Sequence, residues 1–238
     1  MNKLFFSILT LISLGVVAQE NKLVNDANAQ IRTLSAGFTG IKVSDGIDLY
    51  LNQGNEESVA VSASEEKYRE KLKTEVVDGV LKIYYDNKGL NWSNGKKQLK
   101  AYVSFKSLNK LHASEGADVL LSGSMDIAEL DMSFTSGAHF KGKINGGNLS
   151  VDQNSGSNIE ISGTATKLKV AVSSGAVFKG YDLTTEYCDA NASSGGGVRI
   201  TIAKELSAKA NSGGGIKYKG EAVVKNVNIS SGGSVKKG

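Results

Sequence analysis

The side chains that could carry out chemistry are few in this chain of 238 residues: two histidines, His112 and His139, and one cysteine, Cys188. A metal site needs three or four converging ligands, and two histidines that lie 27 residues apart do not meet that number. We expect His139 to be a solvated surface residue beside Asp118 and Asn158. The single cysteine cannot form an intramolecular disulfide. The sequence therefore predicts no metal and no other cofactor.

Carboxylates could serve a carbohydrate-active enzyme, because cleavage of a polysaccharide needs grouped acids or a base beside a cation. Asp131 and Asp152 are expected to point outward on successive repeats but in different columns, and Asp189 lies three repeats after Asp131. No dense acidic group results. We therefore predict no catalytic residues, and a polysaccharide lyase or hydrolase is the alternative.

Two glycine-rich steps, 195–197 and 213–215, resemble phosphate-binding loops at first sight. A phosphate loop would continue into Lys-Ser or Lys-Thr and a helix, and neither step does. Calcium-binding glycine repeats would also carry a regularly placed Asp, which is missing. Packing at chain corners is the better interpretation of these glycines.

One outward column carries charge and is the candidate binding site. Its members stand four or five residues after successive Ser-Gly steps, and they are Lys141, Glu160, Lys179, Arg199 and Lys217. Because adjacent strands lie about 4.8 Å apart, Glu160 could pair with a lysine on either side. The simplest interpretation is a solvated, salt-bridged face. The functional interpretation is a basic column, formed by Lys141, Lys179, Arg199 and Lys217, that binds an anionic glycan or lipopolysaccharide.

The elements that position these side chains follow from a repeat. Ser-Gly steps recur every 18 to 20 residues, at Ser136-Gly137, Ser155-Gly156, Ser174-Gly175, Ser194-Gly195, Ser212-Gly213 and Ser231-Gly232. A fixed period near 20 residues is typical of stacked repeats that bury a shared core. Glycine would supply the bend at each corner, and stacked serines could exchange hydroxyl hydrogen bonds.

Apolar columns flank each step and predict two strands per repeat. Six residues before five of the serines stand Leu130, Leu149, Leu168, Cys188 and Leu206. The alternation continues at every second residue on both sides of the step, so Cys188 is expected to be a small buried hydrophobe. Such a coil is a right-handed parallel β-helix, or β-solenoid, with repeats of about 19 residues. An up-and-down barrel is the alternative.

Residues 36–110 depart from the repeat and predict an N-terminal β-rich cap that contains one short helix. Ser64 followed by two acids indicates a capped helix through about Lys73, and Asp78-Gly79 indicates a hairpin. Asp45-Gly46 is a candidate for an additional, earlier corner. Proline is absent from the chain, which suits long hydrogen-bonded strands.

The expected organisation is a signal peptide over 1–18, a linker over 19–35, the cap over 36–110 and the Ser-Gly repeat β-helix over 111–238, with 36–238 forming one continuous domain. Lys3, an apolar run and small residues up to Ala18 are typical of a cleaved secretory signal. No transmembrane anchor is expected after cleavage. The net charge of +4 and the aromatic content of 7%, without a concentrated basic face, argue against a nucleic-acid partner.

Several short motifs resemble those of the autotransporter-adhesin head domain, or GIN domain, of exported bacterial proteins. They are Phe38-Thr39-Gly40-Ile41-Lys42-Val43-Ser44-Asp45-Gly46-Ile47-Asp48-Leu49, Ala101-Tyr102-Val103-Ser104-Phe105 leading to Leu108 and Leu111, and the serial Ser-Gly-Ala or Ser-Gly-Gly steps. The resemblance covers about Ala36 to Ser234. It implies a β-helical exported protein with an adhesive role and no established catalytic residues.

We therefore expect a nonenzymatic protein of the periplasm, the outer-membrane surface or the cell exterior. Its outer face would bind a glycan, a lipid headgroup or an envelope protein. A purely structural envelope protein is a further alternative.

Overall fold

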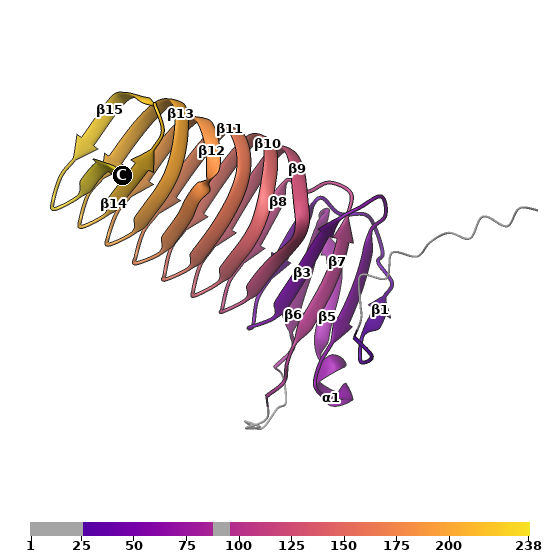
Figure 1. Cartoon of the computed structure of the whole chain (residues 1–238). Helices are drawn as coiled ribbons and strands as arrows, with labels where there is room; N and C mark the ends of the chain where they lie inside the picture. Colours follow the sequence, from indigo (N-terminus) through magenta and orange to yellow (C-terminus); the bar gives the residue numbers. More distant parts are fainter. Residues whose placement is uncertain (1–25, 88–95) are drawn as a thin grey trace, which may run out of the picture.

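The structure is a computed structural model that describes residues 26–87 and 96–238, and 65% of it is strand. The strands stack as a β-solenoid of about 7 turns with a spacing of about 19 residues, which confirms the fold predicted from the Ser-Gly period. Figure 1 shows the coils side by side, with the N-terminal strands and a short helix at one end of the stack. The strands belong to one continuous 16-stranded sheet.

Each complete coil is one long strand rather than the two that the sequence predicted. The coil strands are β9 (Asp118–Phe134), β10 (His139–Gln153), β11 (Asn158–Val172), β12 (Val177–Ala192) and β13 (Gly197–Ala210). These strands pair in parallel along both halves of each coil, before and after a bend near mid-strand. The bend near mid-strand uses glycine where the coils approach closely: at Gly146 and Gly163 φ is 133° and 107°, and a Cβ would lie 2.1 Å from a carbonyl oxygen of the preceding coil.

The Ser-Gly steps form the tight corners between coils. Both residues have positive φ, for example 51° at Ser174 and 72° at Gly175, and Ala176 donates its N–H to the carbonyl of Ser173. This is the geometry of a type I′ turn. The corner glycines of the first five Ser-Gly steps also donate their N–H to the serine carbonyl of the next coil, as Gly175 does to Ser194 at 3.2 Å. Among the described residues, these backbone hydrogen bonds join the Ser-Gly steps of neighbouring coils, whereas no hydroxyl hydrogen bond links the serine of one step to the serine of the next.

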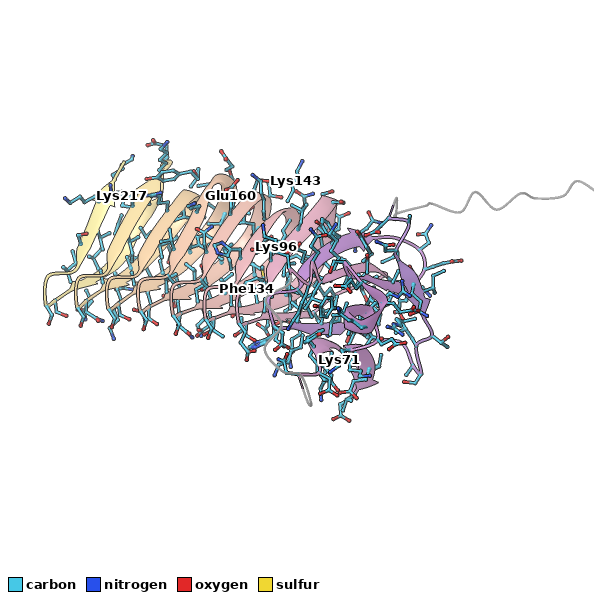
Figure 2. All side chains as sticks on the ribbon, turned by 90° about the horizontal axis from the view of Figure 1, so that it is seen from below. Lys71, Lys96, Phe134, Lys143, Glu160 and Lys217 are labelled. Carbon is cyan, nitrogen blue, oxygen red and sulfur yellow. The ribbon has the colours of Figure 1, made fainter. Side chains whose placement is uncertain are left out.

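The inward columns fill the interior as predicted. Leu130, Leu149, Leu168, Cys188 and Leu206 are all at most 5% exposed. Near the middle of the chain, the Phe134 and Phe140 rings meet edge to face with centroids 5.8 Å apart, and Figure 2 shows Phe134 inside the ribbon. Buried side chains lie above one another from coil to coil, so each coil buries the apolar face of the next.

The N-terminal end begins with a coil that confirms the Asp45-Gly46 corner. Its strands are β2 (Gly40–Val43) and β3 (Asp48–Gln53), which pair in parallel with β8 (Lys110–Ala113) and with the start of β9. Beyond them lie β6 (Val80–Tyr85) and β7 (Lys100–Phe105), also parallel. The outermost strands β1 (Gln30–Arg32), β4 (Ser58–Ser62) and β5 (Leu72–Val77) are antiparallel to their partners. This change of direction ends the parallel stack.

The C-terminal end consists of shorter strands. They are β14 (Gly215–Lys219), β15 (Val223–Ile229) and β16 (Ser234–Lys237). β14 and β15 pair with β13, and β16 pairs with β14. A single apolar core cluster extends from Phe38 to Ile216, so the N-terminal strands and the repeats share one interior.

Two local predictions near the N-terminal end were wrong. Helix α1 spans only Glu66–Arg69, and no side chain caps it. The helix stops early because the Asp78-Gly79 hairpin requires Leu72–Val77 as the partner strand of β6. β1 lies inside the segment 19–35 that the sequence suggested as a linker. The proposed signal peptide lies outside the described residues.

Candidate functional site

The charged column predicted from the sequence is a row of exposed side chains on the first half of each coil. Strand register places its members next to one another in the order Lys141, Glu160, Lys179, Arg199 and Lys217. Pairing of β14 with β16 adds Lys236, which the sequence reasoning missed although it stands four residues after its corner glycine. Figure 2 shows Glu160 and Lys217 on the same side of the solenoid.

Only one end of this row is neutralised. The Nζ of Lys141 lies 2.7 Å from Oε1 of Glu160. That hydrogen bond, together with the charges of Lys141 and Lys179, lowers the pKa of the Glu160 carboxyl. Among the described residues, Arg199, Lys217 and Lys236 have no carboxylate within ion-pairing distance. The four cations from Lys179 to Lys236 are called the basic strip below.

A shallow trough of about 250 Å³ lies beside the basic strip at Arg199 and Lys217. Glycines from 195–197 and 213–215 contribute to its lining. The interpretation of corner packing is confirmed for Gly196 and Gly214, because a Cβ there would lie 2.5 Å and 2.2 Å from carbonyl oxygens of the preceding coil. The trough therefore follows from close stacking of the corners beside the cations.

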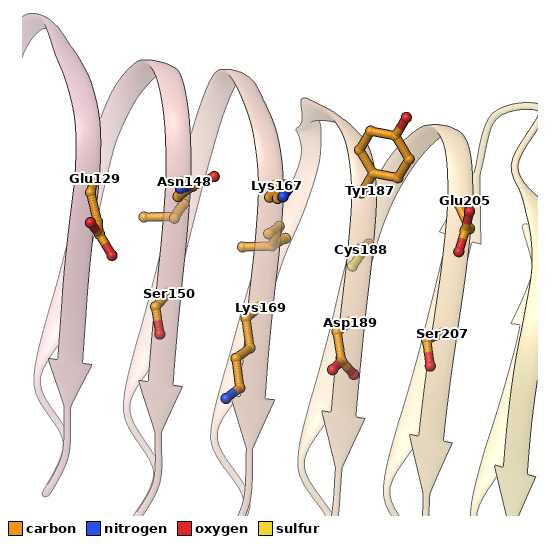
Figure 3. Close-up of a pocket in the computed structure, with 12 residues that line it drawn as sticks. Glu129, Asn148, Ser150, Lys167, Lys169, Tyr187, Cys188, Asp189, Glu205 and Ser207 are labelled. Carbon is orange, nitrogen blue, oxygen red and sulfur yellow. The ribbon is translucent and has the colours of Figure 1, made fainter.

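A second depression, of about 410 Å³, lies on the other half of the coils and was not predicted (Figure 3). We call it the tyrosine groove. Its two rims are outward columns in register, one of Glu129, Asn148, Lys167, Tyr187 and Glu205, and the other of Ser150, Lys169, Asp189 and Ser207. Its floor is the column of Leu149, Leu168 and Cys188. The signal in the sequence was Tyr187, an aromatic residue in an outward position beside the Leu column.

The histidines lie apart from both sites. His139 is exposed between Asp118 and Asn158, as predicted. His112 is half-buried, and burial lowers the pKa of its imidazole. Within residues 26–87 and 96–238, no group of three or more His, Cys, Asp or Glu side chains is placed to hold a metal ion.

The Cys188 thiol is buried, as the sequence predicted. Burial, with a smaller effect of the neighbouring Asp189 carboxylate, raises the pKa of Cys188 to about 12. The thiolate is the nucleophilic form, so very little of it exists at neutral pH. Cys188 therefore acts as part of the core.

The outward acids named in the sequence do not converge. Asp131 and Asp189 share a column but are separated by two coils, and Asp152 stands in the neighbouring column. The structure instead places Asp48 beside Asp118 on adjacent strands, a pair that sequence reasoning missed. Burial and the charge of Asp118 raise the pKa of the Asp48 carboxyl. Their proximity depends on pairing between β3 and β9, which lie 70 residues apart in the chain.

A family model described as "Putative auto-transporter adhesin, head GIN domain" matches residues 37–222. This chain belongs to the GIN-domain family. The GIN-domain match contains β2 through β14 and three members of the basic strip, whereas Lys236 lies beyond it. The family description gives the chain an adhesin-like character.

Solved structures share the fold of this GIN-domain chain. A "putative adhesin" from Bacteroides fragilis has a TM-score of 0.81 at 16% identity, over 88% of this chain and 95% of that one. A "putative adhesin" from Parabacteroides merdae has a TM-score of 0.71 at 16% identity, over 90% and 97%. A "putative lipid binding protein" from Parabacteroides distasonis has a TM-score of 0.63 at 19% identity, over 90% and 98%. No curated protein matches the chain. At these identities the likeness shows the fold alone.

The described part of this GIN-domain chain contains no helix that is long and apolar enough to cross a membrane.

Proposed function

We propose that this GIN-domain protein is an exported, nonenzymatic binding protein of the cell envelope, and that its basic strip holds an anionic glycan. One observation carries the proposal. Lys179, Arg199, Lys217 and Lys236 stand side by side on adjacent strands, and the last three have no carboxylate partner among the described residues.

Stability of the sheet does not explain this arrangement. Like charges directly opposite one another on neighbouring strands are destabilising, whereas alternating charges would be favourable. Each pair of neighbouring cations in the strip therefore lowers the stability of the folded state slightly. An extended polyanion would supply the missing negative charge, and the strand spacing of about 4.8 Å would hold the cations in a rigid row beneath it.

Binding of a polyanion requires a row of cations, because a single surface charge contributes little affinity. An exposed ion pair contributes about 0–1 kcal/mol, so useful affinity needs several contacts made together. The trough beside Arg199 and Lys217 leaves space next to the cations, and the adhesin-like family description supports a binding role. The related protein described as lipid binding makes an anionic lipid surface the main competing ligand.

The test is retention of the chain from Gln19 onward on immobilised heparin and on polygalacturonate at low salt. Lys179, Arg199 and Lys217 are replaced by Gln together. The matched control replaces Lys106, Lys110 and Lys209 by Gln, which removes the same charge from exposed positions outside the basic strip, the trough and the tyrosine groove. Thermal melts of both variants verify that they fold.

We expect the strip variant to elute at much lower salt than the wild type and the control to elute close to the wild type. Equal losses in the two variants would mean nonspecific charge attraction and would refute the assignment of the strip. Binding to phosphatidylglycerol vesicles but to neither polysaccharide would replace the glycan by a lipid headgroup. Release of unsaturated or reducing products from polygalacturonate would favour the enzyme alternative.

A further inference from the structure

The tyrosine groove is separate from the basic strip and shares no residue with it. It crosses the five strands β9 to β13 on the other half of each coil, and its volume of about 410 Å³ falls within the range of small-ligand sites. It is a depression between two rims of polar side chains (Figure 3), and the strand segments at Leu149, Leu168 and Cys188, whose side chains are buried, form its floor. We propose that this groove binds an uncharged oligosaccharide.

The charges of the groove select against a charged ligand. Glu129, Asp189 and Glu205 provide three carboxylates, and Lys167 and Lys169 provide two ammonium groups. Glu205 is already paired with a lysine outside the groove at 2.9 Å. The remaining charges balance, so the groove offers no net attraction to a polyanion or a polycation.

The groups on the rims suit hydroxyls. Carboxylates only accept hydrogen bonds, ammonium groups only donate them, and a sugar hydroxyl can do both. Lys169 and Asp189 stand opposite each other on adjacent strands. Among the described residues they form no ion pair with each other, so both are available to a ligand. Ser150 and Ser207 add hydroxyls on the same rim.

Tyr187 supplies the apolar contact. Its side chain is 40% exposed, and Figure 3 shows its ring standing at the rim rather than folded into the sheet. The Lys204 ammonium lies 5.6 Å from the ring centroid and is held by Glu186 at 2.8 Å. A tyrosine ring combines a broad apolar face with a polar tip and few rotatable bonds, so it can cover the face of a sugar ring at a small entropy cost.

A peptide strand fits this groove less well. Peptides that add to sheets bind through backbone hydrogen bonds at a free edge. β10, β11 and β12, which form the middle of the groove, are each paired on both sides along their length, so their backbone groups are already engaged. Recognition here must rely on side chains, which favours a hydroxyl-rich ligand.

The test is two-dimensional amide NMR of the labelled protein with cellohexaose, xylohexaose, maltohexaose and mannohexaose at millimolar concentration. We expect shifts for at least one sugar, centred on Ser150, Lys169, Asp189 and Ser207. Tyr187→Ala should weaken that binding at least tenfold. Tyr181→Ala is the matched control, because Tyr181 also lies beneath a lysine, Lys219 at 4.4 Å, but on the other half of the coil, and it should bind like the wild type.

Three outcomes would overturn the proposal. The first is that none of the four sugars shifts groove residues, and the second is that Tyr187→Ala binds as the wild type does. The third is that hexaalanine, used as a peptide probe, binds the groove in a Tyr187-dependent manner while the sugars do not. Melting temperatures of both variants check the fold. Because the strip residues are untouched, the result is independent of the anionic-glycan proposal.

Discussion

Gln153 is a buried polar residue in an otherwise apolar column, and its replacement by Met should stabilise the protein. It is 1% exposed and stands in register with Phe134 and Val172. Its Nε2 donates to the Val177 carbonyl at 3.2 Å and reaches the Ser157 hydroxyl only at 3.5 Å. Its Oε1 is buried without a hydrogen-bond partner.

The expected gain follows from these contacts. Removing a buried, unsatisfied acceptor recovers about 1–3 kcal/mol, whereas the lost hydrogen bond to Val177 costs about 1 kcal/mol. Met has the unbranched shape of Gln and can occupy the same space. The net stabilisation should be up to about 2 kcal/mol. At roughly 2–4 °C per kcal/mol for a domain of this size, the melting temperature should rise by up to about 8 °C.

The assay is thermal and urea unfolding followed by far-ultraviolet circular dichroism at pH 7. The control is Val172→Gln, which places the same amide in the same column of the next coil, where Ala176 stands in place of Ser157. It should be destabilised by about 1–3 kcal/mol. If Gln153→Met melts at or below the wild-type temperature, Oε1 has a partner such as a bound water, and the reasoning fails.

Three further changes test other parts of the structure. Burial and the charge of Asp118 raise the pKa of the Asp48 carboxyl in the folded protein. The contribution of this carboxyl to stability is therefore present below its usual pKa and is lost as the pH rises through its folded-state pKa. Asp48→Asn should raise the melting temperature at pH 7 but not at pH 3. In Gly175→Ala the new Cβ meets no atom within 4 Å, so the substitution should cost only the backbone strain of a φ of 72°, about 1–2 kcal/mol. In Gly146→Ala the new Cβ collides with a carbonyl oxygen, so this variant should have the lower melting temperature. The buried Cys188 thiol should react with a disulfide reagent at pH 8 about a hundredfold more slowly in the folded than in the urea-unfolded protein, and rapid native labelling would contradict its place in the core.

The repeat region was predictable because its period sets the register. Once the period stacks Leu168, Cys188 and Leu206, the alternation of inward and outward residues beside each Ser-Gly corner places Lys179 next to Arg199, so this row follows from the sequence. The same rule placed His139 beside Asp118 and buried Cys188. Periodicity thus converts a local sequence pattern into contacts between coils.

The sequence could not predict features that depend on pairing without a period. The end of helix α1 depends on competition from the β5–β6 hairpin, and the Asp48–Asp118 pair depends on strands distant in the chain. The continuous bent strands were missed because the alternation of inward and outward residues shows where a chain turns but not whether its backbone hydrogen bonds continue through the bend. The tyrosine groove was missed because it depends on the relative heights of neighbouring side chains, which the inward pattern does not report.

The two proposed sites illustrate how one coil can carry two unrelated chemistries. Inward positions must remain largely apolar from coil to coil, because each stacks on its neighbours. Outward positions are free of that requirement, and a difference at one of them changes only a single step of a row. On the first half of the coils the outward residues accumulate charge of one sign, whereas on the second half they balance charge around Tyr187. The interior would tolerate alternating charges equally well on both halves of the coils. The unbalanced row is therefore the feature that the stability of the sheet does not account for, and the proposed glycan binding rests on it most directly.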